Sequence, residues 1–504
     1  MNTFAVNAIA TLLGASLTFA FAPFGQWYLV YICLPLGLYL LHQYSSKPVQ
    51  TAWWFGLGYF GAGISWVHVS IATFGGLPLV VSLFLMLLLC GYLALFPAIC
   101  VAILSRFFTF ALWPLAIPLV WLVTEWVRAH FLTGFPWLSI AYSQIDSPLS
   151  GMLPVIGEIG VSALVLCISA SIAVGIAHKK WLPPVLLSLL LFTLGWTTKS
   201  INWVTESNEK ISVALVQGNI EQSIRWQPEQ DIPTIEKYKR LSETHWSSDI
   251  VIWPEAAIPV LESMPLALET LRSLDELATS HNTALITGSV DYQGRTQEAY
   301  NNLLALGMDI KGKNTIPYSY RHENRFSKHH LLPIGEFVPF ESLLRPLAPI
   351  FDLPMSSFNR GDFEQENLLA NGYHLVPAIC YEIAFPKQVK ANIKVHSDLL
   401  VTVSNDAWFG DSHGPHQHLE IARMRAIEFA LPIVRATNTG VTAAFDHRGD
   451  NLGQLDQFVD DVLNVNIALV EGRTPYFVFG DIPIYLLSTV LFVIACFVST
   501  RSKA

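Results

Sequence analysis

The stretch Leu375-Val-Pro-Ala-Ile-Cys-Tyr-Glu382 is an apolar, strand-like run that ends on Cys380, followed by a tyrosine and a glutamate. The other five of the six cysteines lie inside long apolar runs, so Cys380 has no disulfide partner in its own polar region. A solitary thiol in such a position is a candidate nucleophile. Because a free cysteine is more often a small, inert core residue, the rest of the chain has to decide between these interpretations.

The composition indicates a membrane protein with one large polar domain. Of the 504 residues, 52% are hydrophobic and 14% are charged, whereas soluble proteins carry about 25% charged residues. Residues 1–200 contain few ionisable groups, while residues 205–475 have the composition of a soluble domain. The net charge of −9 provides no basic patch of the kind that binds nucleic acid.

Long apolar runs predict the membrane spans. A helix needs roughly 20 apolar residues to cross the hydrocarbon core. We expect about eight spans, with seven or nine left open, near residues 5–22, 27–42, 53–72, 77–104, 107–127, 158–178, 181–198 and 482–500. The predicted parts are a transmembrane helical domain over 1–204 with about seven spans, a polar domain over 205–475, and a C-terminal transmembrane helix over 476–504.

Basic residues predict the orientation, because Lys and Arg concentrate on the cytoplasmic side. With the N-terminus inside, Arg128 and Lys199 fall outside, and the polar domain lies outside as well. The sequence Ala20-Phe21-Ala22 resembles a signal-peptide cleavage site, but its flank lacks Lys and Arg, so we expect a retained span. The residues on the cytoplasmic side are Lys47, Arg106, Lys179, Lys180, Arg501 and Lys503.

Ionisable residues near the membrane have two interpretations. Glu125 and Arg128 are spaced i, i+3 and can pair on one helical face, and Glu158 begins the next span. Charged groups at membrane depth are functional candidates. Alternatively, this is an interfacial ion pair beside the headgroup-level aromatic residues Trp126 and Trp137.

The polar domain alternates short apolar runs with helical stretches, which predicts an α/β domain whose sheets are covered by helices. Polar residues follow several strands: Glu255 after 250–253, Cys380 after 375–379, and Asn405 after 399–404. Sites in open α/β folds gather at such carboxyl ends. The runs are 212–216, 250–253, 284–287, 303–306, 375–379, 399–403, 433–436 and 441–445, and the helical stretches are 234–244, 266–280 and 418–430.

Three residue types together suggest nucleophilic catalysis. A carboxylate such as Glu255 can remove the thiol proton of Cys380, since only the thiolate attacks. Lys328, taken alone an ordinary surface lysine, would favour the thiolate and stabilise an oxyanion if it lay in the same pocket. Glu336, eight residues after Lys328, would keep its ammonium charged.

The histidines of the segment 411–418 are candidate metal ligands. His413, His416 and His418 lie near Asp411, but their spacing matches zinc ligands only loosely. We therefore expect a hydrogen-bonding turn and no metal. The nearby residues expected to form a structural ion-pair network are Arg423, Arg425, Glu428 and Arg435.

Several motifs together resemble one family. Trp253-Pro-Glu255, Lys328-His-His-Leu-Leu-Pro-Ile-Gly-Glu336, Cys380-Tyr-Glu382 and Asn405-Asp-Ala-Trp-Phe-Gly410 resemble the nitrilase (carbon–nitrogen hydrolase) superfamily. With the spans and the motifs Phe21-Ala-Pro-Phe-Gly25, Gly134-Phe-Pro-Trp137 and 414–428, the whole chain resembles its apolipoprotein N-acyltransferase family.

The resemblance implies an α-β-β-α sandwich outside the bacterial inner (cytoplasmic) membrane, on the periplasmic side in Gram-negative cells. It implies transfer of an acyl chain from a phospholipid, typically phosphatidylethanolamine, to the α-amine of a diacylated apolipoprotein, without a cofactor. Glu255 would be the base, Cys380 the nucleophile, Lys328 the oxyanion stabiliser and Glu336 a supporting residue. The residues that would contact substrate are Trp226, Tyr381, Glu382, Asn405 and Trp408.

Two other functions compete with acyl transfer. A membrane-tethered amidase of the nitrilase type would keep the same triad and use water as the second acceptor. A transporter or scaffold would carry a catalytically inactive polar domain and would not need Cys380.

Overall fold

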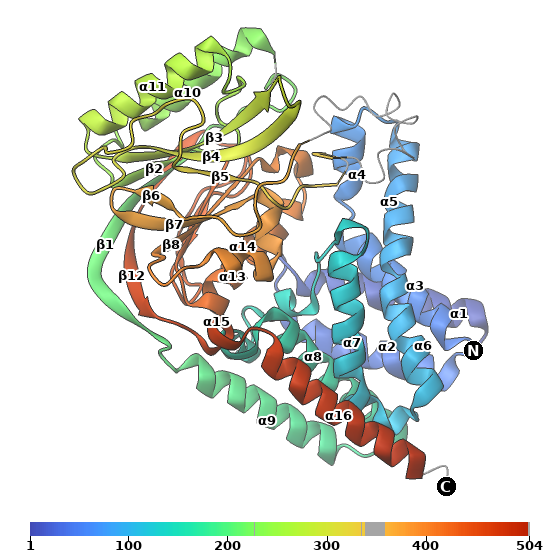
Figure 1. The fold of residues 1–504 in the computed structure, drawn as a ribbon. Helices are drawn as coiled ribbons and strands as arrows, with labels where there is room; N and C mark the ends of the chain where they lie inside the picture. The colour runs from blue at the N-terminus through green and yellow to red at the C-terminus, as the bar shows by residue number, and fades with distance from the viewer. Residues whose placement is uncertain (226, 334, 338–357, 502–504) are drawn as a thin grey trace. The chain divides into compact units, whose positions relative to one another are not determined.

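The computed structural model describes residues 1–225, 227–333, 335–337 and 358–501 (Figure 1). The chain divides into two compact units, one comprising Met1–Trp203 and Arg473–Ala504 and the other comprising Val204–Gly472. The first unit is helical, and the second is built from two β-sheets and their covering helices.

Apolar helices make up the first unit. Short 3-10 turns connect several of them. The helices are α1 (Thr3–Ser16), α2 (Val30–Tyr44), α3 (Pro48–Gly63), α4 (Val67–Val69), α5 (Leu79–Leu93), α6 (Leu95–Phe107), α7 (Trp113–His130), α8 (Leu153–His178), α9 (Leu182–Lys199), α15 (Pro475–Phe479) and α16 (Ile482–Arg501).

Within the described residues, six helical segments are long and apolar enough to cross a membrane, or seven if the bent pair Pro48–Gly63 and Val67–Thr73 counts as one span. Those two helices meet at 62°. The span expected at 27–42 forms α2, whose 15 residues reach only about 22 Å at 1.5 Å per residue. The span count thus agrees approximately with the prediction, and α2 falls short because residues Trp27–Leu29 form a 3-10 turn and the helix begins only at Val30.

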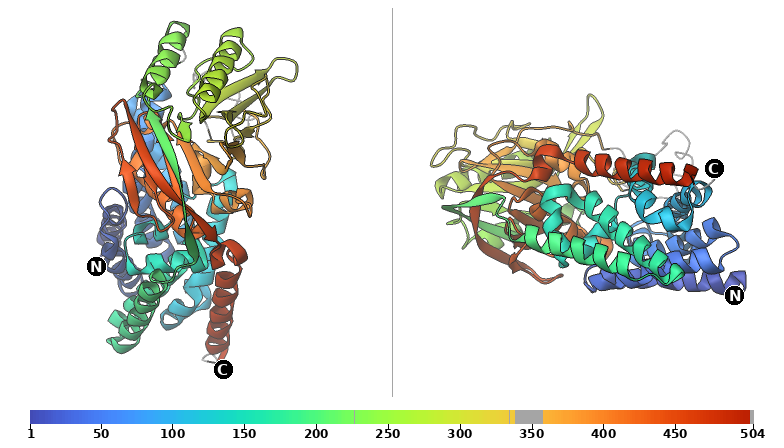
Figure 2. Two further views of the ribbon diagram at one scale, coloured as in Figure 1. Left: turned by 90° about the vertical axis from the view of Figure 1, so that its left-hand side faces the viewer. Right: turned by 90° about the horizontal axis from the view of Figure 1, so that it is seen from below.

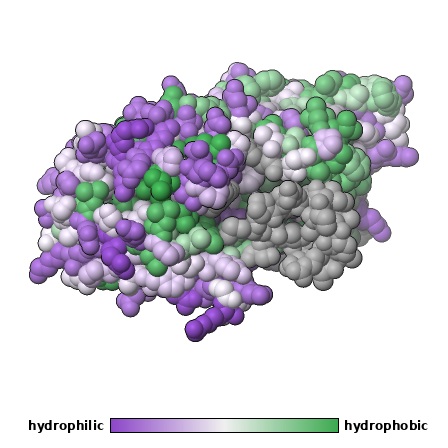
Figure 3. Space-filling view, turned by 90° about the horizontal axis from the view of Figure 1, so that it is seen from above, coloured by the Kyte–Doolittle hydropathy of each residue, from purple (hydrophilic) through white to green (hydrophobic). Residues whose placement is uncertain are grey.

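The outer helices of this unit show why it needs lipid. Only 11% of α9 and 22% of α16 are buried inside the protein, although both are apolar. Side chains such as Leu190 and Val493 are therefore exposed, and Figure 3 shows apolar surface gathered over helical segments. A surface this apolar is stable in a bilayer, where helices satisfy their own backbone hydrogen bonds. The protein is a multi-pass membrane protein.

Glu125 and Arg128 form a buried ion pair on α7. Arg128 also donates from Nη1 to the carbonyl oxygens of Phe135 (2.5 Å) and Trp137 (2.7 Å). The guanidinium thus holds the turn that follows α7, and Trp137 is buried rather than interfacial.

The second unit contains two six-stranded sheets, ordered β12-β1-β2-β3-β4-β5 and β11-β10-β9-β8-β7-β6. Within them, β1-β2-β3 and β7-β8-β9 are parallel, and the remaining pairings are antiparallel, including β1 with β12 (Figure 2). The strands are β1 (Val204–Gln217), β2 (Ile250–Ile252), β3 (Ala284–Gln293), β4 (Glu298–Gly307), β5 (Arg325–Ser327), β6 (Leu368–Ala370), β7 (Tyr373–Ile379), β8 (Leu399–Ser404), β9 (Ile433–Thr437), β10 (Ala443–Phe445), β11 (Asn451–Gln454) and β12 (Asp461–Gly472).

The central strands are buried on both faces, and successive side chains alternate between two cores: Ile250 and Ile252 belong to the core between the sheets, and Val251 to the core under the helices. Residues such as Ile252 and Leu303 of one sheet pack against Val401 and Val434 of the other, which makes the central core. The opposite face of the first sheet packs against α10 (Asp231–Ser242) and α11 (Pro265–Ser280). The second sheet carries α13 (Pro386–Asn392) and α14 (Gly414–Phe429). This arrangement confirms the predicted α-β-β-α sandwich.

Candidate active site

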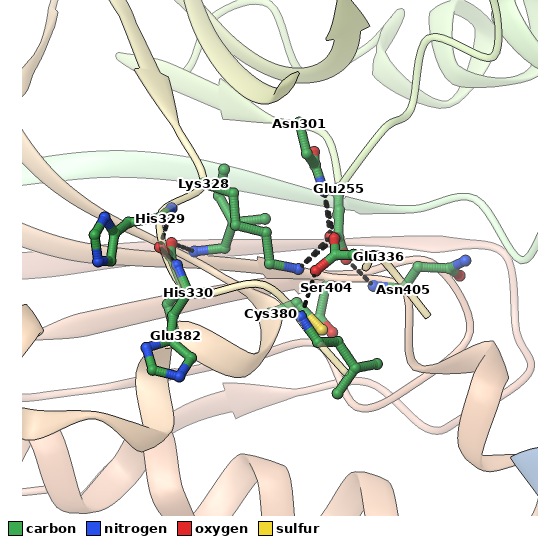
Figure 4. A network of polar contacts seen from close by, with 12 residues as sticks. Glu255, Asn301, Lys328, His329, His330, Glu336, Cys380, Glu382, Ser404 and Asn405 are labelled. Atoms are coloured by element: carbon green, nitrogen blue, oxygen red, sulfur yellow. Dashed lines mark hydrogen bonds and ion pairs between the residues drawn. The ribbon is translucent and has the colours of Figure 1, made fainter. Parts of the chain in front are cut away.

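The three residues expected to carry the chemistry each follow a strand. Glu255 lies just after β2, Lys328 just after β5 and Cys380 just after β7, and Figure 4 shows them converging. The turn at Glu255 passes so close to β3 that a Cβ on Gly288 would lie 2.1 Å from the amide nitrogen of Ala256. A glycine is therefore required there for the backbone to reach this geometry.

Glu255 is 8% exposed and accepts hydrogen bonds on both carboxylate oxygens. Its Oε1 accepts from Asn301 Nδ2 (2.8 Å) and from the ammonium of Lys328 (3.2 Å), while its Oε2 accepts from the backbone N–H of Asn405 (3.0 Å). The carboxylate is thus fixed by contacts from both sheets.

Lys328 is 1% exposed and lies between two carboxylates. Its Nζ is 3.2 Å from Glu255 Oε1 and 2.8 Å from Glu336 Oε1. Burial would lower the pKa of Lys328, but Glu255 and Glu336 outweigh it and hold that pKa well above its usual range. The lysine is therefore a fixed cation in a site with little water.

Cys380 begins a turn immediately after β7. Because β7 and β8 are parallel and Ile379 is paired with Val403, the next residues in register are Cys380 and Ser404. Figure 4 shows the sulfur beside Ser404 and the Lys328–Glu336 pair. Burial and the nearby Glu255 carboxylate raise the pKa of the Cys380 thiol, while Lys328 opposes that rise.

The resting proton distribution follows from these charges. Burial would raise the pKa of Glu255, but the Lys328 ammonium and the Asn301 hydrogen bond outweigh it and leave that pKa lowered. Glu255 is therefore ionised and the Cys380 thiol protonated at neutral pH. The arrangement suits a reaction in which Glu255 removes the thiol proton as the sulfur attacks a carbonyl carbon. The negative charge then lies on the carbonyl oxygen, where the Lys328 ammonium stabilises it.

Two comparisons with known proteins address the whole chain. The model of the apolipoprotein N-acyltransferase N-terminal domain matches residues 13–171, and the carbon–nitrogen hydrolase model matches residues 212–474. The apolipoprotein N-acyltransferase of Photobacterium profundum is 46% identical over 95% of this chain and 92% of its own length. That of Vibrio cholerae is also 46% identical, over 95% of this chain and 94% of its own.

This chain belongs to the apolipoprotein N-acyltransferase family. Among solved structures, the Helicobacter pylori carbon–nitrogen hydrolase is similar at 15% identity and a TM-score of 0.37, covering 51% of this chain and 89% of that one.

In this member of the family, Glu382 braces the turn that carries Cys380. Its carboxylate accepts from the backbone N–H groups of Ile379 (2.8 Å), His329 (2.7 Å) and His330 (3.1 Å), and from Gln388 Nε2 (2.7 Å). These donors occupy its carboxylate and suit a bracing role, while its expected contact with substrate stays a prediction. Glu382 ties the turn after β7 to the segment that follows Lys328.

The other residues expected to bind substrate are distributed around this acyltransferase site. Tyr381 is buried and packs edge-on against Phe385, with ring centroids 5.1 Å apart. Asn405 donates from Nδ2 to Gln222 Oε1 (2.6 Å), and Trp408 is partly exposed in the turn Asp406–Phe409. Trp226 lies outside the described residues.

Two site residues were missed by sequence reasoning. Asn301 Nδ2 donates to both Glu255 (2.8 Å) and Glu336 (3.2 Å), and Ser404 lies beside the sulfur. Asn301 lies in the polar first half of β4 and Ser404 is the last residue of β8. Neither position reveals from the sequence which side chains of the other strands it meets.

The histidine segment is held by hydrogen bonds to separate partners. His416 contacts Gln457 Nε2 (3.0 Å), while His418 faces Asp406 Oδ1 (3.1 Å) and the carbonyl oxygen of Cys380 (3.1 Å). Of the residues expected to form an ion-pair network, Arg425 pairs with Glu428 at 2.9 Å, whereas Arg435 pairs with Asp406 at 2.5 Å and Arg423 with Glu420 at 3.5 Å.

Proposed function

We propose that this chain moves a fatty acyl chain from a membrane phospholipid to the free α-amine of a diacylglyceryl-cysteine lipoprotein, through a thioester on Cys380. The observation that carries the proposal is the Lys328 ammonium held 3.2 Å from Glu255 and 2.8 Å from Glu336 beside that thiol. Family membership and the lipid-exposed helices support a lipid as the acyl donor.

In the first half-reaction, Glu255 takes the thiol proton as the sulfur of Cys380 attacks the ester carbonyl. Lys328 stabilises the oxyanion, and Glu336 keeps that ammonium in place. Collapse of the intermediate breaks the ester C–O bond, Glu255 returns the proton to the leaving oxygen, and lysophospholipid departs. The acyl chain remains on sulfur as a thioester.

In the second half-reaction, the α-amine of the lipoprotein attacks the thioester. Glu255 takes a proton from the attacking nitrogen, the C–S bond of the thioester breaks as the amide forms, and Glu255 returns the proton to the sulfur to regenerate the Cys380 thiol. An α-amino group has a pKa near 8, so a useful fraction is neutral at about pH 7. The two lipids visit in turn, which gives ping-pong kinetics.

The substrate contacts belong to the same proposal. Phosphatidylethanolamine is the donor, and Tyr381, Asn405 and Trp408 contact the substrate. Trp226, expected from the sequence to contact substrate as well, lies outside the described residues. Glu382 acts on these groups through the turn that it braces. The catalytic domain spans residues 205–475, between the membrane parts 1–204 and 476–504.

We also propose that the protein lies in the inner membrane with its catalytic domain on the periplasmic side. A reporter active only in the cytoplasm should work when fused near Lys180, and a reporter active only outside should work near Gln297. These sites follow from the excess of Lys and Arg in the loops assigned to the cytoplasm. The reverse pattern would contradict the orientation.

Product analysis tests the function itself. Purified protein supplied with labelled phosphatidylethanolamine and a diacylated lipopeptide should yield acylated lipopeptide and lysophospholipid in equal amounts. Acetylating the α-amine of the lipopeptide in advance should abolish the transfer, because the nucleophile is blocked. Release of free fatty acid without any acylated lipopeptide would favour the membrane-tethered amidase instead.

A further inference from the structure

The backbone at Cys380 is held in an uncommon conformation. Its φ of +54° lies in the left-handed region that residues with a Cβ seldom adopt. Such a conformation persists only where the surroundings enforce it. The peptide N–H before the residue, that of Ile379, donates to Glu382 Oε2 at 2.8 Å. The carbonyl oxygen of Cys380 faces His418 Nε2 at 3.1 Å.

His418 is completely buried on α14. Its Nδ1 lies 3.0 Å from Arg435 Nη2, which can only donate, so Nδ1 is the acceptor and Nε2 carries the proton. Burial and the Arg435 charge lower the pKa of His418, with Asp406 opposing them. A neutral imidazole of this tautomer donates to the Cys380 carbonyl.

One carboxylate supports both sides of this arrangement. Asp406 accepts from Arg435 Nη2 at 2.5 Å and from Ser404 Oγ at 2.6 Å. Ser404 lies beside the sulfur of Cys380 (Figure 4), and Arg435 orients His418 against the carbonyl. The side chain and the carbonyl of Cys380 are therefore supported by the same buried group.

We propose that His418 is a positioning residue for the nucleophile: its Nε2–H bond to the Cys380 carbonyl holds the turn that directs the sulfur toward Lys328. The inference rests on the proposed role of Cys380 as the nucleophile. It assigns His418 no contact with either substrate, so its loss should slow the covalent steps and leave phospholipid binding unchanged. A misplacement of the reacting atom by about 1 Å can slow a reaction about 100-fold.

Two isosteric amides separate this contact from the others. In His418→Gln the amide nitrogen reaches the former Nε2 position and keeps the bond to the carbonyl. In His418→Asn the amide reaches only the Nδ1 position, so its oxygen can still accept from Arg435 but the bond to the Cys380 carbonyl is lost. We expect His418→Asn to slow acyl-enzyme formation about 30-fold or more, with little change in KM for phospholipid, and His418→Gln to stay within about 5-fold.

Alkylation of Cys380 by iodoacetamide, followed by mass spectrometry, gives a second readout that needs no acyl substrate. His418→Asn should alter the alkylation rate and His418→Gln should restore it, even if the protein used a different acyl donor. His416→Asn on the same helix, which contacts Gln457 instead, is the matched control and should match the unmodified protein.

The inference fails if His418→Asn forms acyl-enzyme within about 3-fold of the unmodified rate, or if His418→Gln is as slow as His418→Asn with an intact thermal transition. Should His418→Asn not fold, His418→Gln alone decides by the same criterion. Failure of the proposed function looks different: the unmodified protein would then form no acylated lipopeptide from phospholipid and diacylated lipopeptide.

Discussion

Replacing Cys380 with alanine should reduce acyl transfer by about 10⁴-fold or more, because the variant has no atom that can carry the thioester. Phospholipid binding should survive, since the substitution removes one small, partly buried side chain. The measurement is the rate of lipopeptide acylation together with phospholipid affinity. Cys496→Ala, in the partly exposed part of α16, is the matched control and should keep the full rate.

The outcome separates the competing functions. A transporter or scaffold with an inactive domain would tolerate Cys380→Ala, and retained acyl transfer in this variant would overturn the mechanism. A membrane-tethered amidase would also lose its activity in Cys380→Ala. This variant therefore distinguishes the amidase from the acyltransferase only together with the product analysis above.

Lys328→Met should have the second-largest effect. The substitution removes the cation that stabilises the oxyanion, which costs about 10²–10³ in rate. It also leaves Glu255 and Glu336 close together, joined by the Asn301 amide but without the ammonium that lies between them. Lys311→Met is the matched control, because Lys311 is exposed and pairs only loosely with Glu209 at 3.6 Å.

The pH dependence distinguishes this loss from simple unfolding. Lys328 helps to hold the pKa of Glu255 below its usual value of 4.5, so the base stays ionised and acyl-enzyme formation should persist as pH falls toward that value. In Lys328→Met the pKa of Glu255 rises, and the residual activity should be lost at a higher pH. Single-turnover acylation between about pH 4 and 8 measures the shift. An acid limb at the same pH in both proteins would contradict this electrostatic account.

Much of the fold was predictable because its signals are local. Apolar runs of five or six residues that end in polar groups indicated β7 and β8, and the helical stretch 266–280 corresponds closely to α11. Strands such as β5 and β6 contain only three residues and have no periodicity to detect. The bend after Gly63 lies inside a continuous apolar run, so hydropathy alone shows one straight span.

The site was predictable only in part, since it depends on residues that meet across the two sheets. Strand ends identified Glu255 and Cys380, and the motif identified Lys328. The bridging role of Asn301 depends on the register of β4, and the partner of His418 depends on how α14 packs. Glu382 follows Cys380 by two residues, yet its side chain turns back to the Ile379 amide.

The most direct test of the central claim is to locate the acyl group by mass spectrometry. Incubation with phospholipid alone should add one acyl chain to Cys380, and adding a diacylated lipopeptide should remove it as the acylated product appears at the same rate. An acylated lipopeptide that forms without any adduct on Cys380, or with the adduct on another residue, would contradict the mechanism.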